Sequence, residues 1–377
     1  MSLTRTELAR YSRHLSLAEV GIAGQEKLKA ARVVVIGAGG LGSPSALYLA
    51  ASGVGTLGIV DCDRIEVSNL QRQVLFETAR VGELKADAAR DRLRALNPEI
   101  QIVSHAVELR AANVRNVLRG YDVVLDGTDR LATRYLVNDA CVMLRKPLIS
   151  AAIHRFEGQA MTYVPGRGPC YRCLFPNVAE GLVPNCAEAG VLGVLPGVLG
   201  AIQATEAIKL IVGAGEPLVA RLLIYDALDM RFDEFPFGRR TDCAVCGEQP
   251  TITELRDPPE LCSAEALATV RRLSPSELRA LIDARGQTML VDVREPREFT
   301  TAHLPGAVNI PVSEIERRLG EIPTDTTPVF LCRSGSRSLN ACRIALGAGR
   351  EAPAHLEGGL LAWAAEVDPA FTVATAG

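Results

Sequence analysis

The chain has 377 residues, with 41 Lys and Arg against 44 Asp and Glu, which gives a formal net charge of -3. This length favours two domains over one. Hydrophobic residues make up 48% and charged residues 23%, as in ordinary globular proteins, and no run of 18 apolar residues occurs. We therefore expect no membrane protein, and without a basic cluster containing interleaved aromatic residues we expect no direct binding of nucleic acid.

The N-terminal segment MSLTRTELARYSRHL is polar and lacks the apolar core of a signal peptide, which predicts a cytoplasmic location. Thiols stay reduced there. The ten cysteines are therefore better interpreted as metal ligands, nucleophiles and core residues than as a disulfide framework.

Short β-branched runs alternate with helical patterns from residue 32 onward. RVVVIGAGG, LGSPSALYLAASG and TLGIVDCD come first, and YDVVLDGTD and RYLVNDACVMLR follow. This order predicts a parallel sheet with crossover helices, an α/β fold of the Rossmann type. A smaller α/β pattern begins near Thr288 with TMLVDVRE and closes with SRSLNACRIALGAG. We expect domains at residues 1–248 and 274–377, joined by a proline-containing linker at 249–273.

A glycine-rich loop follows the first predicted strand. Gly37, Gly39 and Gly42 form G-x-G-x-x-G before a helix, a pattern that lets backbone N–H groups approach a phosphate. Asp61 ends the next predicted strand and suits a ribose hydroxyl pair. The loop predicts a nucleotide but not its identity, so a dinucleotide-dependent dehydrogenase and a tight turn without a ligand both remain open.

A set of polar residues accompanies this loop. It consists of Arg13, Asn69, Arg72, Lys85, Asp126 and Asp129. Hydride transfer has little use for such residues, whereas adenylation of a carboxylate needs Arg, Lys and a divalent ion to neutralise charge on the phosphates. Each residue alone is more often surface charge than catalyst, so the prediction depends on the whole set.

Several segments together resemble the MoeB/ThiF family, relatives of the ubiquitin-activating enzymes. The segments are RYSRHL (10–15), GAGGLGS (37–43), DCDRIEVSNLQRQ (61–73), GELKADAA (82–89), GTD (127–129), PCYRC (169–173) and CAEAGVLG (186–193). The resemblance covers most of residues 5–248. It implies ATP-dependent adenylation of the C-terminal glycine of a small ubiquitin-like sulfur carrier of the MoaD, ThiS or CysO kind.

The resemblance also implies roles for individual residues. Gly39, Gly40 and Asp61 would contact the phosphates and ribose of ATP, Asn69, Arg72 and Lys85 would hold the triphosphate, and Asp129 would bind Mg²⁺. Arg13 would reach into the site of a neighbouring subunit, which implies a homodimer. This sequence departs from the family at Arg130, where an Asn usually follows the magnesium aspartate, so the metal shell is open to question.

Four cysteines occur as two C-x-x-C pairs, Cys170 with Cys173 and Cys243 with Cys246. Four soft ligands complete a closed tetrahedral zinc site. Because the pairs are far apart in sequence, we expect one structural Zn²⁺ that ties distant segments together. Redox C-x-x-C motifs and unliganded thiols are the alternatives, and neither pair is predicted to open a helix after a strand as the thioredoxin arrangement requires.

The second α/β pattern contains a cysteine loop. Cys332 follows the predicted strand PVFL and begins CRSGSRS, which leads into a helix. Only four residues lie between Cys332 and Arg337, one fewer than in the C-x5-R loop of phosphotyrosine phosphatases. Loop amides, Arg333, Arg337 and the helix N-terminus would favour a nucleophilic thiolate at Cys332. A buried structural cysteine is the alternative interpretation.

This loop and the preceding LVDVREPREFTTAHLPGAVNIP resemble rhodanese domains over about residues 274–366. The resemblance implies a persulfide on Cys332, charged by a donor such as a cysteine desulfurase or thiosulfate, and sulfur transfer that leaves a carrier thiocarboxylate. Cys186 stands where some family members have a cysteine that engages the carrier or its sulfur. An adenylating enzyme or a scaffold whose sulfur comes from another protein remains the alternative. We expect Cys62, Cys141, Cys262 and Cys342 to be core or surface residues.

Overall fold

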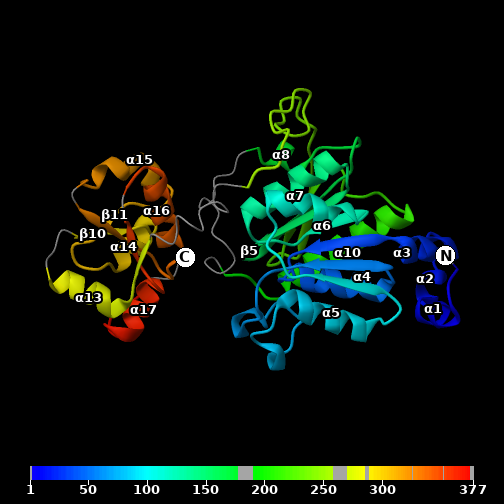
Figure 1. The fold of residues 1–377 in the computed structure, drawn as a ribbon, viewed down its shortest axis with the longest axis horizontal. Helices are drawn as coiled ribbons and strands as arrows, with labels where there is room; N and C mark the ends of the chain where they lie inside the picture. The colour runs from blue at the N-terminus through cyan, green and yellow to red at the C-terminus, as the bar shows by residue number, and fades with distance from the viewer. Residues whose placement is uncertain are drawn as a thin grey trace. The chain divides into compact units, whose positions relative to one another are not determined.

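The computed structural model describes residues 2–176, 190–257, 270–284, 288–324, 326–350 and 352–373. These residues form two compact units, one ending before residue 258 and the other beginning at residue 270 (Figure 1). Each unit has its own sheet and its own apolar core, so each is described by itself.

The first unit contains a sheet in the strand order β3-β2-β1-β4-β5-β6-β7-β8. Its strands are β1 (Arg32–Ile36), β2 (Thr56–Val60), β3 (Gln101–His105), β4 (Val123–Asp126), β5 (Leu148–His154), β6 (Glu157–Tyr163), β7 (Arg221–Asp226) and β8 (Arg231–Pro236). The pairs from β3 to β5 are parallel, as the sequence predicts, but β6, β7 and β8 are antiparallel. The chain therefore adds a meander to a Rossmann-like half.

Helices cover both faces of this sheet. They are α1 (Arg5–Arg10), α2 (Ser12–Leu15), α3 (Gly21–Ala30), α4 (Gly42–Ser52), α5 (Lys85–Leu96), α6 (Ala111–Arg119), α7 (Leu131–Leu144), α8 (Tyr171–Leu174) and α10 (Leu195–Val212), with the 3₁₀ turns η1 (Val67–Asn69) and η2 (Thr78–Arg80). Figure 1 shows α4 and α5 on one side of the sheet and α6 and α7 on the other. This arrangement leaves the carboxyl ends of β1, β2 and β4 at one edge, where parallel α/β sheets bind ligands.

Among the described residues, α10 alone is long and apolar enough to cross a membrane by length and composition. Half of it is buried, and it packs against α4, β5 and β6. Its buried side chains include Leu199, Ala204 and Ala207. A core helix meets the same criterion of length and composition, and the packing of α10 is that of a core helix.

The second unit contains a smaller sheet in the order β11-β10-β12-β13-β9, with parallel pairs throughout. Its elements are β9 (Arg271–Leu273), α13 (Pro275–Asp283), β10 (Thr288–Asp292), α14 (Pro296–Thr301), β11 (Val308–Asn309), α15 (Ile315–Arg318), η3 (Leu319–Glu321), β12 (Thr327–Leu331), α16 (Ser336–Gly347), β13 (Ala354–Leu356) and α17 (Gly359–Glu366). Strand β9 lies within the stretch that we expected to be linker. Its three residues are too few, and two of them too polar, to give a strand pattern.

Candidate functional site

The glycine loop joins β1 to α4 at the carboxyl edge of the first sheet. Gly37 has φ +85°, a left-handed conformation that glycine adopts without a steric penalty. A Cβ on Gly42 would lie 1.8 Å from the carbonyl oxygen of Gly37, so no larger residue fits this turn. The backbone therefore bends tightly enough to present its amides at the edge of the sheet, as a phosphate site requires.

Asp61 follows β2 and lies against this loop. Its Oδ2 accepts a hydrogen bond from the Ala38 N–H at 2.8 Å, and its Oδ1 accepts one from the Asp63 N–H at 2.8 Å. Burial raises the pKa of Asp61, and the nearby Lys85 opposes that rise. The carboxylate is thus held beside the glycine loop at the position where a ribose binds in Rossmann-type folds.

The predicted triphosphate ligands come from the segment after β2 and from the start of α5. Lys85 is only 6% exposed, and its Nζ lies 3.2 Å from Asp63 Oδ2. Asn69 is buried in η1, where its Oδ1 accepts a hydrogen bond from the Glu66 N–H at 3.3 Å. Arg72 donates to the Ser68 carbonyl at 3.1 Å, and its Cδ lies 3.6 Å from where a Cβ on Gly40 would be. The structure thus brings Arg72 next to the glycine loop, as the sequence suggested.

Asp126 and Asp129 differ in their surroundings. Asp126, at the end of β4, is fully buried and accepts hydrogen bonds from Thr128 N at 3.0 Å and Ser150 Oγ at 2.9 Å. Asp129 is exposed, three residues further along the same loop. Arg130 forms an exposed ion pair with Glu108 at 3.4 Å, so in this structure it points its charge at another carboxylate. Asp126 therefore shapes the loop, and Asp129 is the carboxylate of this loop that is exposed to solvent.

Arg13 lies on α2 and is exposed. Neither a hydrogen bond nor an ion pair joins its side chain to the glycine loop or to any other described residue of its own chain. Its predicted role involves a second subunit, so a single chain does not test that role.

Three residues that the sequence did not single out help to build the site. Arg134 of α7 is buried and pairs with Asp126, and Gln203 of α10 donates to the Asp126 carbonyl at 2.7 Å. The buried Gln73 has its Nε2 3.8 Å from where a Cβ on Gly39 would lie, and its Oε1 has no partner among the described residues. Gln73 stands in the motif DCDRIEVSNLQRQ, so that motif carried a signal for it, whereas Arg134 and Gln203 look like ordinary helix positions.

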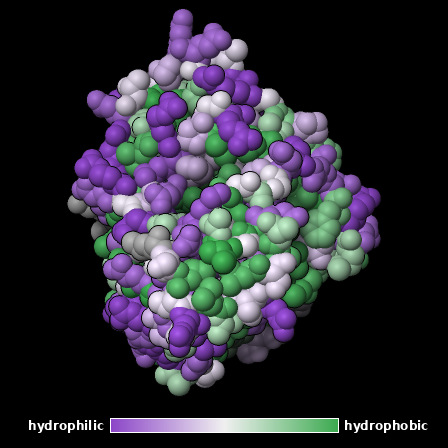
Figure 2. Space-filling model, turned by 90° about the vertical axis from the view of Figure 1, so that its right-hand side faces the viewer, coloured by the Kyte–Doolittle hydropathy of each residue, from purple (hydrophilic) through white to green (hydrophobic). Residues whose placement is uncertain are grey.

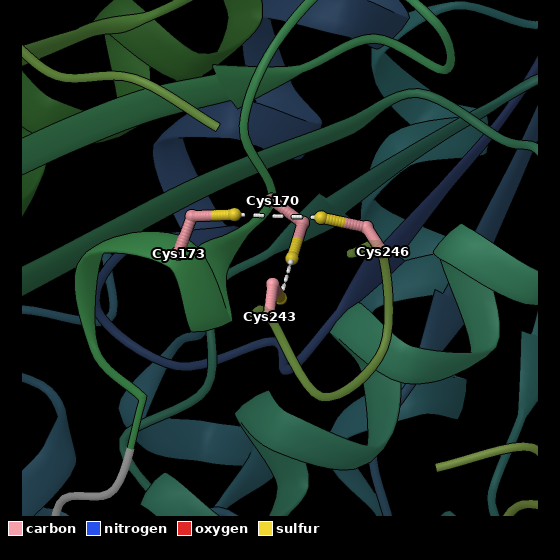
Figure 3. Close-up of side chains that lie close together, drawn as sticks. All are labelled: Cys170, Cys173, Cys243 and Cys246. Atoms are coloured by element: carbon pink, nitrogen blue, oxygen red, sulfur yellow. Dashed lines mark hydrogen bonds between the residues drawn. The ribbon is translucent and has the colours of Figure 1, made fainter. Parts of the chain in front are cut away.

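The four paired cysteines converge at one point in the first unit (Figure 3). Their sulfur atoms all lie within 4.8 Å of one another, with 3.7 Å between Cys170 and Cys243 and 3.4 Å between Cys173 and Cys246. Tetrahedral zinc with Zn–S bonds of about 2.3 Å separates its sulfurs by about 3.8 Å. The donor set and its spacing fit a Zn²⁺ ion. Cys170 is the N-cap residue of the short helix α8, a local feature that we did not expect.

Protein groups also surround these sulfurs. The Arg240 N–H donates to Cys173 Sγ at 3.5 Å, and the buried Asn138 side chain approaches Cys170 Sγ at 3.9 Å. Such N–H donors stabilise metal-bound thiolates. Hydrogen bonding with Cys173 is the largest factor that raises the pKa of Cys170, and a cation beside this thiol would act in the opposite direction and favour its thiolate.

Cys332 lies between β12 and α16 in the second unit. Its side chain is fully buried, and its Sγ accepts a hydrogen bond from the Gly335 N–H at 3.1 Å. The Cys332 carbonyl accepts another from the Leu360 N–H at 2.8 Å. Gly359 has φ +64°, and a Cβ there would lie 2.5 Å from that same carbonyl oxygen. Strand, loop and α17 thus hold the sulfur at a helix N-terminus, where a negative charge is favoured.

The two arginines of the Cys332 loop differ in their hydrogen-bond partners. Arg337 forms two contacts with the Glu298 carboxylate, at 2.7 and 3.0 Å. The Nε atom of Arg333 is buried and has no hydrogen-bond partner among the described residues. Arg333 therefore has a buried donor at Nε that no described residue uses.

A short chain of polar side chains continues inward from Cys332. Its Sγ lies 3.5 Å from Ser338 Oγ, which lies 3.4 Å from Nδ1 of His355. Both partners are buried, and burial, with a smaller effect of Arg272, lowers the pKa of His355. No sequence pattern pointed to His355, because it occurs in an otherwise apolar strand.

The remaining cysteines divide as expected where the structure describes them. Cys141 and Cys342 are buried, and burial raises the pKa of both thiols, whereas Cys62 is exposed. Cys186 and Cys262 lie outside the described residues.

The sequence matches two family models, the ThiF family over residues 11–245 and the rhodanese-like domain over residues 274–366. A probable adenylyltransferase/sulfurtransferase MoeZ of Mycobacterium tuberculosis is 46% identical, over 98% of this chain and 95% of the relative. The adenylyltransferase and sulfurtransferase MOCS3 of Aedes aegypti is 42% identical, over 98% and 90%. Escherichia coli MccB, solved with ATP, has a TM-score of 0.56 at 28% identity and covers 63% of this chain and 74% of its own.

Proposed function

This chain belongs to the ThiF family and ends in a rhodanese-like domain, and from this premise we propose that it activates a ubiquitin-like sulfur carrier and then delivers sulfur to it. Adenylation would use residues 1–248 and sulfur transfer residues 274–377. One observation carries the proposal: the same chain contains both halves of the chemistry. It has a glycine loop beside Lys85 and Arg72, and it has a buried cysteine, Cys332, at a helix N-terminus. Relatives named for both activities match nearly the whole length.

In the first stage, the C-terminal Gly-Gly carboxylate of the carrier attacks the α-phosphate of ATP, and pyrophosphate leaves. The attacking group is already ionised, so the site needs no general base. It needs positive charge where negative charge develops on the phosphates. Lys85, Arg72 and Asn69 supply this charge and these donors, the loop at Gly39 and Gly40 supplies backbone amides, and Asp61 binds the ribose.

Two metal ions are part of the proposal. Mg²⁺ would be held by the exposed carboxylate of Asp129 and would neutralise charge on the phosphates. Zn²⁺ would be held by Cys170, Cys173, Cys243 and Cys246 and would join α8 to the segment after β8. A closed four-sulfur shell leaves no open position, which supports a structural role for the zinc.

In the second stage, a persulfide on Cys332 attacks the carbonyl carbon of the acyl-adenylate and AMP leaves. The product is an acyl disulfide between the carrier and Cys332. A second thiol then attacks the Cys332 sulfur, which releases the carrier thiocarboxylate and leaves a disulfide that an external dithiol reduces. Cys186 is our proposed second thiol. A cysteine desulfurase or thiosulfate would recharge Cys332.

Exposed residues of the first unit support the proposal of two protein partners, a second copy of this chain and the carrier. Arg13 is exposed and has no hydrogen-bond or ion-pair partner among the described residues, which supports a homodimer in which it completes the neighbouring site. Figure 2 shows the face at the N-terminal side of Figure 1, where apolar side chains gather among polar ones. At the edge of the sheet that β8 forms, Phe232 and Phe235 are exposed, together with Leu228 and Met230. We propose this edge as the carrier surface, because exposed aromatic clusters mark protein contacts.

The test is an ATP-pyrophosphate exchange screen of the full chain against each small Gly-Gly carrier of the source organism. We expect exchange with at least one carrier and none without a carrier. Saturable NAD binding without exchange would replace this proposal with a dehydrogenase. Exchange that is followed by thiocarboxylate formation at the normal rate in Cys332→Ala would favour an adenylating enzyme whose sulfur comes from another protein.

A further inference from the structure

Arg134 is a buried charge to which the proposed reaction assigns no role. It lies in the first turns of α7 and is only 5% exposed. Its Nε lies 3.3 Å from Asp126 Oδ2, and its Nη2 donates to the Thr128 carbonyl at 2.6 Å. A charged side chain is buried at a cost unless it is fully paired, so this position has a specific reason to hold an arginine.

The two partners of Arg134 define the loop that carries Asp129. Thr128 donates its N–H and its Oγ1 hydroxyl to Asp126 Oδ1, at 3.0 and 2.8 Å. The intervening Gly127 donates its N–H to the Ile36 carbonyl at 2.9 Å, and a Cβ on Gly37 would lie 3.1 Å from the Gly127 carbonyl oxygen. The loop is therefore fixed against the glycine loop on one side and against the Arg134 guanidinium on the other.

The other side of Arg134 faces the cysteine cluster. Its guanidinium lies 5.6 Å from the centre of the Tyr171 ring. Tyr171 immediately follows Cys170 and begins α8. Its N–H donates to the Asn138 side chain at 2.9 Å, and Asn138 is also the residue that approaches Cys170 Sγ. A continuous series of contacts thus runs from the cysteine cluster to the loop of Asp129.

We propose that Arg134 is a positioning residue of the nucleotide site. Tyr171 holds the Arg134 guanidinium in place, and the guanidinium in turn holds the Asp126–Asp129 loop so that Asp129 faces the cation of Mg·ATP. This proposal rests on the function proposed above. The guanidinium is needed for its shape, because one planar group contacts a carboxylate, a carbonyl and a ring at once. A lysine keeps the charge but can satisfy only one of these directions.

The test compares Arg134→Lys with Arg172→Lys in the full chain. Arg172 is a matched control, because it also lies on the α7–α8 contact, pairs with Asp139 at 2.7 Å and lies 4.3 Å from an aromatic ring, that of Tyr135. Among the described residues, the contacts of Arg172 are with Asp139 and the Tyr135 ring and not with the Thr128 loop. ATP binding is measured by calorimetry at increasing Mg²⁺ concentration, a measurement that needs no carrier.

We expect Arg134→Lys to raise the Mg²⁺ concentration at half-saturation by about tenfold, the usual effect of losing support behind a metal ligand. Arg172→Lys should leave it within about twofold, even if it lowers the melting temperature as much. Equal half-saturation in the two variants would overturn the inference. Wild-type protein that binds no Mg·ATP would instead overturn the proposed adenylation, so the two failures are distinguishable.

A second variant covers the case in which Arg134→Lys does not fold. Tyr171→Leu keeps Arg134 and Asp126 but removes the ring and hydroxyl behind the guanidinium. We expect the same direction of change in Mg²⁺ half-saturation with unchanged zinc content, and Tyr171→Phe should restore part of it because the ring remains. Wild-type half-saturation in Tyr171→Leu would contradict the role given to Tyr171 and to the series of contacts.

Discussion

Replacing Lys85 with Met should separate the chemistry of the first unit from its stability. The Lys85 side chain is almost entirely buried, but its ion-pair partner Asp63 is well exposed to water. Met keeps most of the apolar stem and removes the charge. An ion pair with an exposed partner contributes little to folding, so we expect the free energy of unfolding to fall by no more than about 1 kcal/mol.

The expected effect on the reaction is much larger. A preorganised charge directed at a reacting phosphate contributes about 3 to 4 kcal/mol to the barrier, which corresponds to a rate reduction of about 10²- to 10³-fold. Removal of Lys85 also removes the charge that opposes the raised pKa of Asp61, so the ribose carboxylate should ionise less readily. Both effects lower turnover.

The assay is carrier-dependent ATP-pyrophosphate exchange, with chemical denaturation of the same protein. Lys29→Met is the matched control, because Lys29 pairs with the buried Glu7 at 2.7 Å, away from the nucleotide loop. It should cost about 1 to 3 kcal/mol of stability, since it leaves a buried carboxylate without its cation, yet it should keep normal exchange. Exchange within about tenfold of wild type in Lys85→Met would refute the assignment of Lys85 to the phosphates.

Three further predictions concern the cysteines and the second unit. Cys332→Ala should keep ATP-pyrophosphate exchange but lose thiosulfate:cyanide sulfurtransfer and donor-dependent formation of the carrier thiocarboxylate, which mass spectrometry of the carrier detects. Thiocarboxylate formation at the wild-type rate would show that Cys332 is not the sulfur carrier. Zinc analysis should give one ion per chain, and Cys243→Ser should reduce both the zinc content and the melting temperature. A zinc-free protein in which all four thiols can be titrated would exclude the metal site. Because the pKa of His355 is lowered, the unfolded chain binds a proton first as the pH falls through about 6.5, so the second unit should lose stability below that pH. His355→Gln should flatten this pH dependence in scanning calorimetry, and an unchanged slope would assign it to another group.

The sequence predicted those parts of the molecule that depend on local patterns. The glycine loop after β1, Asp61 after β2 and the cysteine loop before α16 all lie where the alternation of strands and helices puts them. The predicted convergence of the four cysteines is also confirmed, since their sulfur atoms lie within 4.8 Å of one another. The identity of the metal and the roles of the site residues stay predictions.

Other parts could not be predicted, because they depend on contacts between distant segments. Arg134 lies in a helix whose pattern does not distinguish a buried arginine from an exposed one, and only the folded chain brings it between Asp126 and Tyr171. His355 is similar, since its partner Ser338 lies on another element. The antiparallel strands after β5 were missed because their alternation of polar and apolar residues is weak, as the largely exposed β8 shows.

Strand β9 determines where an expressed fragment of the second unit should begin. Residues Arg271–Leu273 of β9 pair with β13, so β9 forms one edge of the second sheet. Strand β13 is the strand that leads to Gly358 and Gly359. The rhodanese-like family match begins only at residue 274. A fragment trimmed to that match would leave β13 with unpaired backbone groups, and such edges associate with other chains. A fragment intended for sulfurtransfer work should therefore start upstream of Val270, so that the sheet keeps its own border and the molecule stays monodisperse.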